Sequence, residues 1–117
     1  DYFKSYNDTY GHPEGDNLLR RVSEVFIANL RGVETICRYG GDEFVVILPG
    51  TDIQHAQMAA EKLRQRVDEI FKKEKVTLSI GVAEYSPHLS RMDLTLRADK
   101  ALYEAKKQGR NRVSIYQ

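Results

Sequence analysis

Cysteine is almost absent from this sequence, which has one, Cys37, among 117 residues. A single cysteine excludes a disulfide within the chain and favours a reducing, cytoplasmic setting. Long hydrophobic runs are lacking as well. No apolar stretch approaches the roughly 20 residues that a membrane-spanning helix needs, so we do not expect this domain to be inserted in a membrane, whether or not a longer parent protein is anchored upstream.

An excess of charge of one sign is also lacking. The chain has 18 basic and 17 acidic residues, a formal net charge of +1, so neither a long nucleic-acid polymer nor an anionic membrane surface is the expected partner. The length suits one domain with one core, and 41% hydrophobic with 30% charged residues is typical of a globular domain. Residues 1–4 lack an initiator methionine and look like the end of a strand, so we expect a larger parent protein.

Apolar residues recur every three or four positions in three segments, which predicts three helices. They cover about 16–31, 51–70 and 91–107. The second helix opens at Thr51–Gln54, which has the spacing of a capping box, and Gly109 is expected to cap the third. The polar residues 5–15, punctuated by glycine and proline, predict a loop before the first helix.

Strands are predicted between these helices. Alternating apolar and polar or small residues predict a strand at 76–82, and the other strand segments are a hairpin at 36–48 and a short last strand at 113–116. With the partial strand at residues 1–4, the order is β, α, β, β, α, β, α, β. This order predicts an α+β sandwich, with helices packed on an antiparallel-rich central sheet whose N-terminal strand is incomplete.

The most informative segment is residues 38–44, Arg-Tyr-Gly-Gly-Asp-Glu-Phe. Gly40 and Gly41 predict a two-residue hairpin turn, because both positions can take positive φ angles without a Cβ clash. The turn places Asp42 and Glu43 at the start of the returning strand, beside backbone that a bulky ligand can approach. Paired carboxylates at such an opening suit a divalent metal and a phosphate substrate. A tight turn with two solvated acids is the alternative.

Asn7 and Asp16 form a second candidate site. A carboxylate can accept hydrogen bonds from N1–H and the exocyclic amine of guanine, and an amide can pair with N3 or the amine. The alternative is structural: Asn7 and Asp8 form an Asx-turn, and Asp16 caps the following helix. His12 is expected to order the loop between them.

Isolated basic residues flank several predicted turns and element ends. They are Lys4, Arg38, Lys106 and Arg110. These residues suit a phosphate clamp, in which arginine makes bidentate contacts and lysine supplies a point charge. Lys106 and Arg110, near the end of the third helix, can equally serve as partners of the helix dipole and the last carbonyl groups.

Together these segments carry a resemblance that covers the whole chain. Its motifs, in order, are Asp1-Tyr2-Phe3-Lys4, Asn7-Asp8, Gly11-His12, Gly15-Asp16, Arg38 to Phe44, Leu78 to Val82, and Ala98-Asp99 to Asn111. In this order the sequence resembles the GGDEF family of bacterial diguanylate cyclases. The resemblance implies a palm-like fold, similar to adenylyl cyclase and polymerase palm domains. It also implies one GGDEF domain over residues 1–117, truncated at its N-terminus.

The implied activity is the condensation of two GTP molecules into cyclic di-GMP with release of two pyrophosphates. The resemblance further implies Mg²⁺ or Mn²⁺, two ions per active site, and a homodimer in which each subunit presents one GTP. An upstream sensory or regulatory domain is expected in the parent protein. The alternative is a catalytically inactive domain of the same family that binds GTP or cyclic di-GMP as a sensor. The intact pair of Asp42 and Glu43 argues against this alternative.

The same resemblance implies roles for individual residues. Asp42 is implied as a metal ligand and as the base for the attacking 3′-hydroxyl, and Glu43 as a metal ligand that assists beside it. Asn7 and Asp16 are implied to hold guanine, with His12 supporting their loop. The other implied substrate contacts are Phe3, Lys4, Arg38, Gly40, Gly41, Lys106 and Arg110.

Two departures from the family pattern concern these sites. The family's other main metal carboxylate lies two positions before Asp1, outside this sequence, so the fragment alone is expected to be impaired. The product-inhibition motif of the family is Arg-x-x-Asp, and the matching positions here are Arg31 and Glu34. Glutamate keeps the charge but adds a methylene group, so we expect weak feedback by cyclic di-GMP.

Overall fold

The computed structural model describes residues 1–30, 32 and 35–117. Within these ranges the chain combines four helices with four short strands, which confirms the predicted α+β class. In order they are α1 (Phe3–Tyr10), α2 (His12–Asn29), β1 (Thr35–Gly40), β2 (Glu43–Ile47), α3 (Ile53–Ile70), β3 (Ser79–Val82), α4 (Arg91–Lys107) and β4 (Arg112–Ile115). None of the helices described is long and apolar enough to cross a membrane.

The two later helices begin and end close to their predicted bounds. α4 has the predicted bounds, because a capping box starts it and Gly109, with φ 124°, follows its end. α3 begins one residue later than the capping-box spacing predicted. The reason is that Asp52, not Thr51, is the N-cap, and its side chain accepts the backbone N–H of His55.

The first ten residues differ most from the prediction. Residues 3–10 form α1 in place of the predicted strand end and loop, and α2 begins four residues earlier than predicted. The segment has no apolar periodicity, but Phe3 and Tyr6 pack against the hydrophobic core, and this packing overrides weak local propensity. Gly11, with φ 90°, separates the two helices, and Pro13 suits the first turn of α2.

The strands of the described chain form two separate pairs. β1 and β2 are antiparallel, whereas β3 and β4 are parallel. These four strands therefore do not form the single antiparallel-rich sheet that the sequence predicted. The parallel pair arises because α4 connects β3 to β4 as a crossover, which returns the chain in the same direction.

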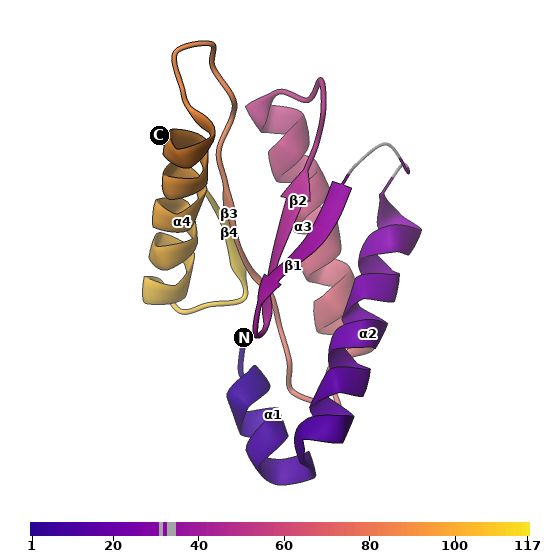
Figure 1. Ribbon diagram of the computed structural model, residues 1–117. Helices are drawn as coiled ribbons and strands as arrows, with labels where there is room; N and C mark the ends of the chain where they lie inside the picture. The colour runs from indigo at the N-terminus through magenta and orange to yellow at the C-terminus, as the bar shows by residue number, and fades with distance from the viewer. Residues whose placement is uncertain (31, 33–34) are drawn as a thin grey trace.

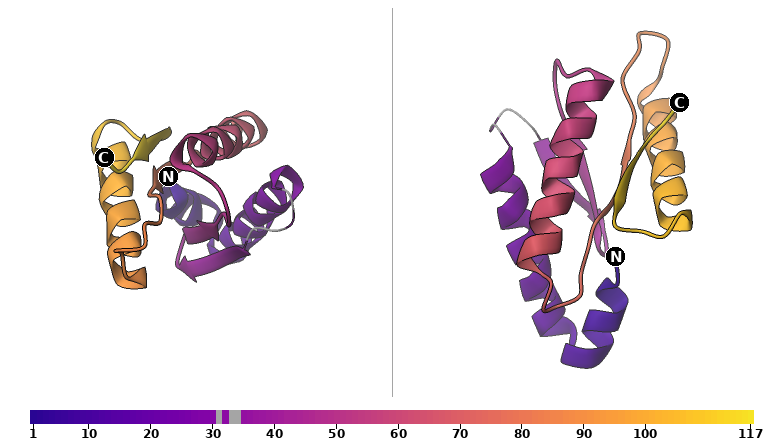
Figure 2. Two further views of the ribbon diagram at one scale, coloured as in Figure 1. Left: turned by 90° about the horizontal axis from the view of Figure 1, so that it is seen from above. Right: turned by 180° about the vertical axis from the view of Figure 1, so that it is seen from behind.

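The hydrophobic core lies between α2, α3 and the strands (Figures 1 and 2). Apolar residues on one face of each helix are buried there, and the most deeply buried are Leu18, Val67 and Phe71. Phe26 of α2 meets Phe44 of β2 edge to face, with the ring centroids 5.2 Å apart. α3 and α4 both contact the β3–β4 pair, which lies between them in Figure 1.

Gly81 of β3 packs directly on α4. A Cβ atom there would overlap the backbone of Ala98 and Leu102, lying 2.8 Å from the Leu102 Cα. Because the backbone of a packed helix cannot move aside cheaply, Gly81→Ala should lower the free energy of unfolding by about 1–3 kcal/mol. Urea unfolding measures the change. Gly40→Ala, whose added Cβ would meet nothing within 4 Å, is the matched control; an equal loss of stability in both variants would contradict the packing argument.

Candidate active site

The turn of the β1–β2 hairpin is displaced by one residue from its prediction. Gly40 pairs with Glu43, so the loop residues are Gly41 and Asp42, not Gly40 and Gly41. The cause is a register shift between Arg38 and Gly40, a β-bulge that gives β1 one extra residue. Gly41 has φ 52°, in the left-handed region that tight hairpin turns use. Arg38 donates from Nε to the Gly41 carbonyl oxygen at 2.9 Å and so holds the turn together.

Both acidic side chains at this turn are exposed. Asp42 lies in the loop, and Glu43 is the first residue of β2. In the part of the chain that the structure describes, no group of three or more His, Cys, Asp or Glu residues is arranged to hold a metal ion. Two carboxylates nevertheless fit Mg²⁺, because proteins commonly hold this ion with one or two carboxylates, completed by water and substrate phosphates.

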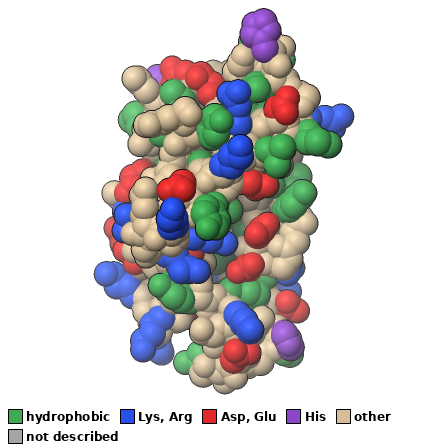
Figure 3. All heavy atoms as spheres, turned by 90° about the vertical axis from the view of Figure 1, so that its left-hand side faces the viewer, with side chains coloured by type: hydrophobic (Ala, Val, Ile, Leu, Met, Phe, Trp, Pro, Cys, Tyr) green, Lys and Arg blue, Asp and Glu red, His purple; other side chains and the backbone are tan. Residues whose placement is uncertain are grey.

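Charged residues from distant parts of the sequence converge near Asp1. In Figures 1 and 2 the start of the chain, the hairpin tip and the α4–β4 turn lie together at one end of the β3–β4 pair. The Asp42 carboxylate, the Lys106 ammonium group and the Arg110 guanidinium all lie close enough to Asp1 to affect the electrostatic potential at its backbone nitrogen. Figure 3, which shows the α4 side, has basic side chains interspersed with acidic ones.

The Asp1 side chain also belongs to this region, and the sequence did not predict its contacts. Its carboxylate is only 1% exposed. It accepts hydrogen bonds from the hydroxyl groups of Thr77 and Ser79, at 2.9 and 2.8 Å, and from the backbone N–H of Asn111 at 3.1 Å. The alternation of Thr77 and Ser79 was the available signal, since it places two hydroxyl groups on one face of the predicted strand.

Asn7 of α1 faces Gly15 of α2 at the corner between the two helices. Its Oδ1 atom is buried and has no hydrogen-bond partner among the described residues. A Cβ atom on Gly15 would overlap this oxygen, so only glycine leaves room for the amide. An unpaired buried acceptor costs about 1–3 kcal/mol, and a ligand N–H that reaches it would therefore be bound favourably. Asp16, the next residue, is exposed beside it.

The structural alternatives for these polar residues are wrong. Asn7 and Asp8 lie inside α1 and not in an Asx-turn. The N-cap of α2 is Gly11, so Asp16 does not cap this helix. His12, which was expected to order a loop, is the exposed first residue of α2. Neither the Asx-turn nor the helix cap therefore accounts for Asn7 and Asp16.

The remaining predicted contacts lie at the ends of α1 and α4. Phe3 and Lys4 begin α1, where backbone N–H groups have no acceptor in a preceding turn. The Phe3 ring packs towards Gly15, 3.2 Å from where a Cβ would lie, and Lys4 is exposed. Lys106 is in the last turn of α4, where a cation also suits the helix dipole, and Arg110 lies in the turn that follows.

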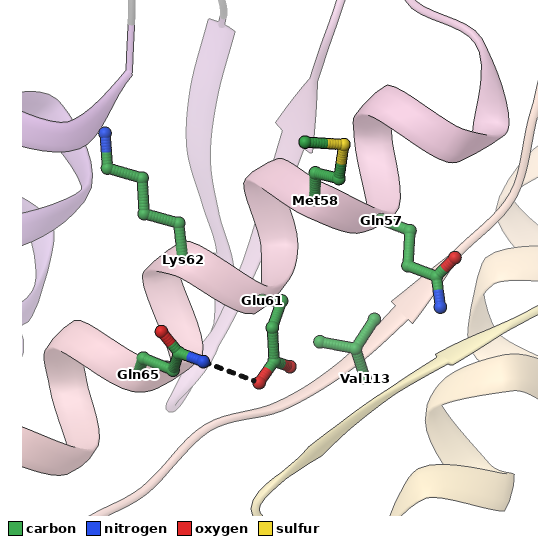
Figure 4. A pocket seen from close by; sticks show the side chains of 6 residues that line it. All are labelled: Gln57, Met58, Glu61, Lys62, Gln65 and Val113. Atoms are coloured by element: carbon green, nitrogen blue, oxygen red, sulfur yellow. Dashed lines mark hydrogen bonds between the residues drawn. The ribbon is translucent and has the colours of Figure 1, made fainter.

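A surface pocket of about 470 Å³ on α3, shown in Figure 4, is lined by Gln57, Met58, Glu61, Lys62, Gln65 and Val113. Gln65 donates to Glu61 there at 3.3 Å, and none of the predicted site residues lines the pocket. The predicted inhibitory pair, Arg31 and Glu34, lies outside the described residues, so weak feedback stays a prediction.

The family follows from a match over nearly the whole chain. Residues 1–112 match the family model described as diguanylate cyclase, GGDEF domain. The chain belongs to the GGDEF family. The active GGEEF domain of a diguanylate cyclase from Vibrio cholerae superposes with a TM-score of 0.92 at 36% identity, over 100% of this chain and 78% of that one. The GGDEF domain of DgcB from Caulobacter crescentus, in complex with c-di-GMP, superposes with a TM-score of 0.90 at 35% identity, over 99% of this chain and 72% of that one.

Curated relatives of this GGDEF chain are considerably longer than it is. Diguanylate cyclase A of Treponema denticola is 46% identical over 98% of this chain and 33% of its own length. Diguanylate cyclase DosC of Escherichia coli strain K12 is 41% identical over 99% of this chain and 26% of its own length. The chain thus spans a third or less of these relatives, both of which are named diguanylate cyclases.

Proposed function

We propose that this chain is the catalytic domain of a diguanylate cyclase, which condenses two GTP molecules into cyclic di-GMP and releases two pyrophosphates. The observation that carries the proposal is the buried, unpaired Oδ1 atom of Asn7, an acceptor for which the described structure has no donor. Carboxylates at the hairpin turn and cations near Asp1 supply the other groups that phosphoryl-type transfer needs. Relatives named as diguanylate cyclases at 46% and 41% identity support the same activity.

Guanine recognition is assigned to Asn7 and Asp16. Guanine presents its N1–H and exocyclic amine as adjacent donors, which the Asp16 carboxylate can accept, and the Asn7 Oδ1 can accept a further amine proton. Adenine has no N1–H, so it would leave acceptors of the site unpaired and bind more weakly. His12 lies one turn before Asp16 on α2 and borders this site.

Triphosphate binding is assigned to groups at the ends of α1 and α4. The backbone N–H groups of Phe3 and Lys4 point out of the first turn of α1, where the helix dipole favours an anion. The Lys4 side chain and Lys106 supply point charges, and the Arg110 guanidinium can make two parallel hydrogen bonds to phosphate oxygens. The position of both cations near the backbone nitrogen of Asp1 supports this grouping of Lys106 with Arg110.

Asp42 and Glu43 would hold Mg²⁺ or Mn²⁺, two ions per site. Such ions, when bound, stabilise the attacking and leaving oxygens of an in-line displacement. Asp42 accepts the proton of the attacking 3′-hydroxyl, and Glu43 assists beside it. Arg38 keeps both carboxylates in place through its bond to Gly41, and the glycines leave the turn open to the triphosphate.

The reaction requires two copies of the domain, because each copy binds one GTP. The 3′-hydroxyl of one GTP attacks the α-phosphorus of the other, the bond to pyrophosphate breaks, and the same step with exchanged roles closes the ring. Holding two bound substrates face to face supplies the proximity that makes this step fast. A homodimer is therefore part of the proposal, with its assembly controlled by other domains of the parent protein.

The palm-like architecture is also part of the proposal. Both strand pairs end near Asp1, whose backbone nitrogen donates to the Thr77 carbonyl oxygen at 2.8 Å. A strand that leads into Asp1 would lie beside the β3 segment and could join both pairs into one central, antiparallel-rich sheet. The TM-scores of 0.92 and 0.90 to solved domains of the family support this arrangement.

Nucleotide selectivity tests the assignment of guanine. In the full-length protein, Asp16→Ala should weaken GTP binding by roughly 1–3 kcal/mol, because charged hydrogen bonds to the base are lost, and should leave the weaker ATP binding nearly unchanged. Asn7→Ala should act in the same direction. Isothermal titration with both nucleotides gives the comparison. Asp8→Ala, an exposed carboxylate next to Asn7 on α1, is the matched control. Equal losses for GTP and ATP, or an equal loss in the control, would disprove the assignment.

A further inference from the structure

The turn between α4 and β4 has an unusual backbone. Gly109 has φ 124°, and the next two residues, Arg110 and Asn111, have φ 65° and 48°. The left-handed region is unfavourable for residues that carry a Cβ atom, so two in succession persist only where their surroundings hold them. This strained turn carries Arg110, the residue to which the proposed function assigns triphosphate contacts.

Hydrogen bonds from different elements hold this turn. The backbone N–H of Asn111 donates to the Asp1 carboxylate at 3.1 Å. The side-chain oxygen of Asn111 accepts from Arg64 of α3 at 2.9 Å. Arg112 donates from Nε to the Arg110 carbonyl oxygen at 3.1 Å. Of these contacts, those from Asp1 and Arg112 act directly on the backbone of the left-handed segment, and the one from Asp1 ties it to a part of the chain 110 positions away.

The Asp1 carboxylate is itself firmly fixed. It is 1% exposed, and the hydroxyl groups of Thr77 and Ser79 donate to it at 2.9 and 2.8 Å. Because this buried carboxylate accepts several hydrogen bonds, it keeps its position even if the turn between α4 and β4 moves. Asp1 therefore links the β3 segment rigidly to the residue that follows Arg110.

Direct pairing holds the Arg110 side chain only weakly. Its Nε lies 4.0 Å from the Asp1 carboxylate, and the side chain is 46% exposed. Its Cζ lies 5.8 Å from the centroid of the Tyr2 ring, near the outer limit of a cation–π contact. A half-exposed ion pair at this separation contributes little. The conformation of the turn, more than either side-chain contact, sets where the guanidinium lies.

We infer that Asp1 is a positioning residue of the active site: through the N–H of Asn111 it fixes the left-handed turn that directs Arg110 towards the triphosphate. The inference rests on the proposed function, which gives Arg110 its phosphate. Asp1 does not itself bind substrate in this role, because its buried carboxylate already accepts from Thr77, Ser79 and Asn111.

Comparison of GTP with GMP in the full-length protein tests this role. Asp1→Asn keeps the shape of the side chain but removes its charge and one acceptor oxygen, which loosens the turn. GTP affinity, measured by calorimetry, should fall on the order of tenfold, because Arg110 contacts phosphates that GMP lacks, and GMP affinity should stay the same. Asp52→Asn is the matched control: it removes a carboxylate that accepts the backbone N–H of His55 on α3, and it should change neither affinity.

A double-mutant cycle separates positioning from general destabilisation. Arg110→Ala should weaken GTP binding, and adding Asp1→Asn should cause no further loss, because the positioned side chain is gone. If Asp1→Asn does not fold, Ser79→Ala removes one donor to the same carboxylate and should give a smaller loss that is again confined to GTP.

Two failures are distinguishable. Additive losses in the double variant, or equal losses of GTP and GMP affinity, would overturn the positioning role and leave the phosphate role of Arg110 standing. Unchanged GTP affinity in Arg110→Ala would overturn the phosphate role, and the positioning role of Asp1 with it.

Discussion

Asp42→Asn should reduce the rate of cyclic di-GMP synthesis by the full-length protein by about 10²–10³-fold, the usual effect of losing one charge-stabilising group in an active site. Asparagine has nearly the same size, but it lacks the negative charge that holds a metal ion and accepts the proton of the 3′-hydroxyl. The fold should not change, because Asp42 is exposed in a two-residue loop. The measurement is the initial rate of product formation at saturating GTP and Mg²⁺, followed by chromatography.

Asp52→Asn is the matched control for this loss of activity. It removes the same charge at an exposed position at the start of α3, and the rate of synthesis should stay at the wild-type level. Thermal unfolding of both variants shows whether either substitution has affected folding. An Asp42→Asn protein that keeps more than about a tenth of the wild-type rate would show that this carboxylate neither binds the metal nor acts as the base.

Gly15→Ala should both destabilise the domain and weaken the binding of GTP. Replacing glycine by alanine inside a helix ordinarily stabilises it by about 1 kcal/mol. At this position the added Cβ would overlap Asn7 Oδ1 and lie 3.2 Å from the Phe3 ring. We therefore expect a loss of about 1–3 kcal/mol in the free energy of unfolding. Because the Asn7 amide must move to relieve the overlap, GTP affinity should fall by about tenfold.

The double variant Gly15→Ala/Asn7→Ala separates these two effects. Without the Asn7 amide the new methyl group has room, so urea unfolding should show most of the stability restored. GTP affinity should nevertheless remain as low as in Asn7→Ala alone. Recovery of GTP affinity together with stability would contradict the assignment of Asn7 to guanine.

Local structure was predictable where periodicity and capping signals agree. α4 has the predicted bounds because a capping box forms at its first turn: the side chains of Ser90 and Asp93 each accept a hydrogen bond from the other residue's backbone N–H. This pattern is visible in the sequence. The hairpin shows the limit of such signals. Two adjacent glycines predict a turn, but strand pairing decides which residues occupy it, and the bulge before Gly40 moves the turn to Gly41 and Asp42.

The parts of the fold and the site that the sequence did not predict depend on contacts between residues distant in the sequence. α1 forms because Phe3 and Tyr6 pack on the core, and no local pattern of apolar residues predicts this helix. Asp1 and Asn111 are separated by 110 positions, so no motif joins them. The guanine-binding role of Asn7 could be proposed from the chemistry of its amide and from the family resemblance, whereas the unpaired state of its Oδ1 atom depends on the packing of α1 against α2.

Product analysis tests the proposed activity most directly. The full-length protein is incubated with GTP and Mg²⁺, and the nucleotide product is identified by mass spectrometry while pyrophosphate is quantified. We predict cyclic di-GMP and pyrophosphate in a ratio of one to two, no cyclic dinucleotide from ATP, and a specific activity that rises with protein concentration as dimers form. A dimeric protein that binds GTP or cyclic di-GMP but yields no product would contradict the proposed catalysis and would identify the chain as a nucleotide receptor.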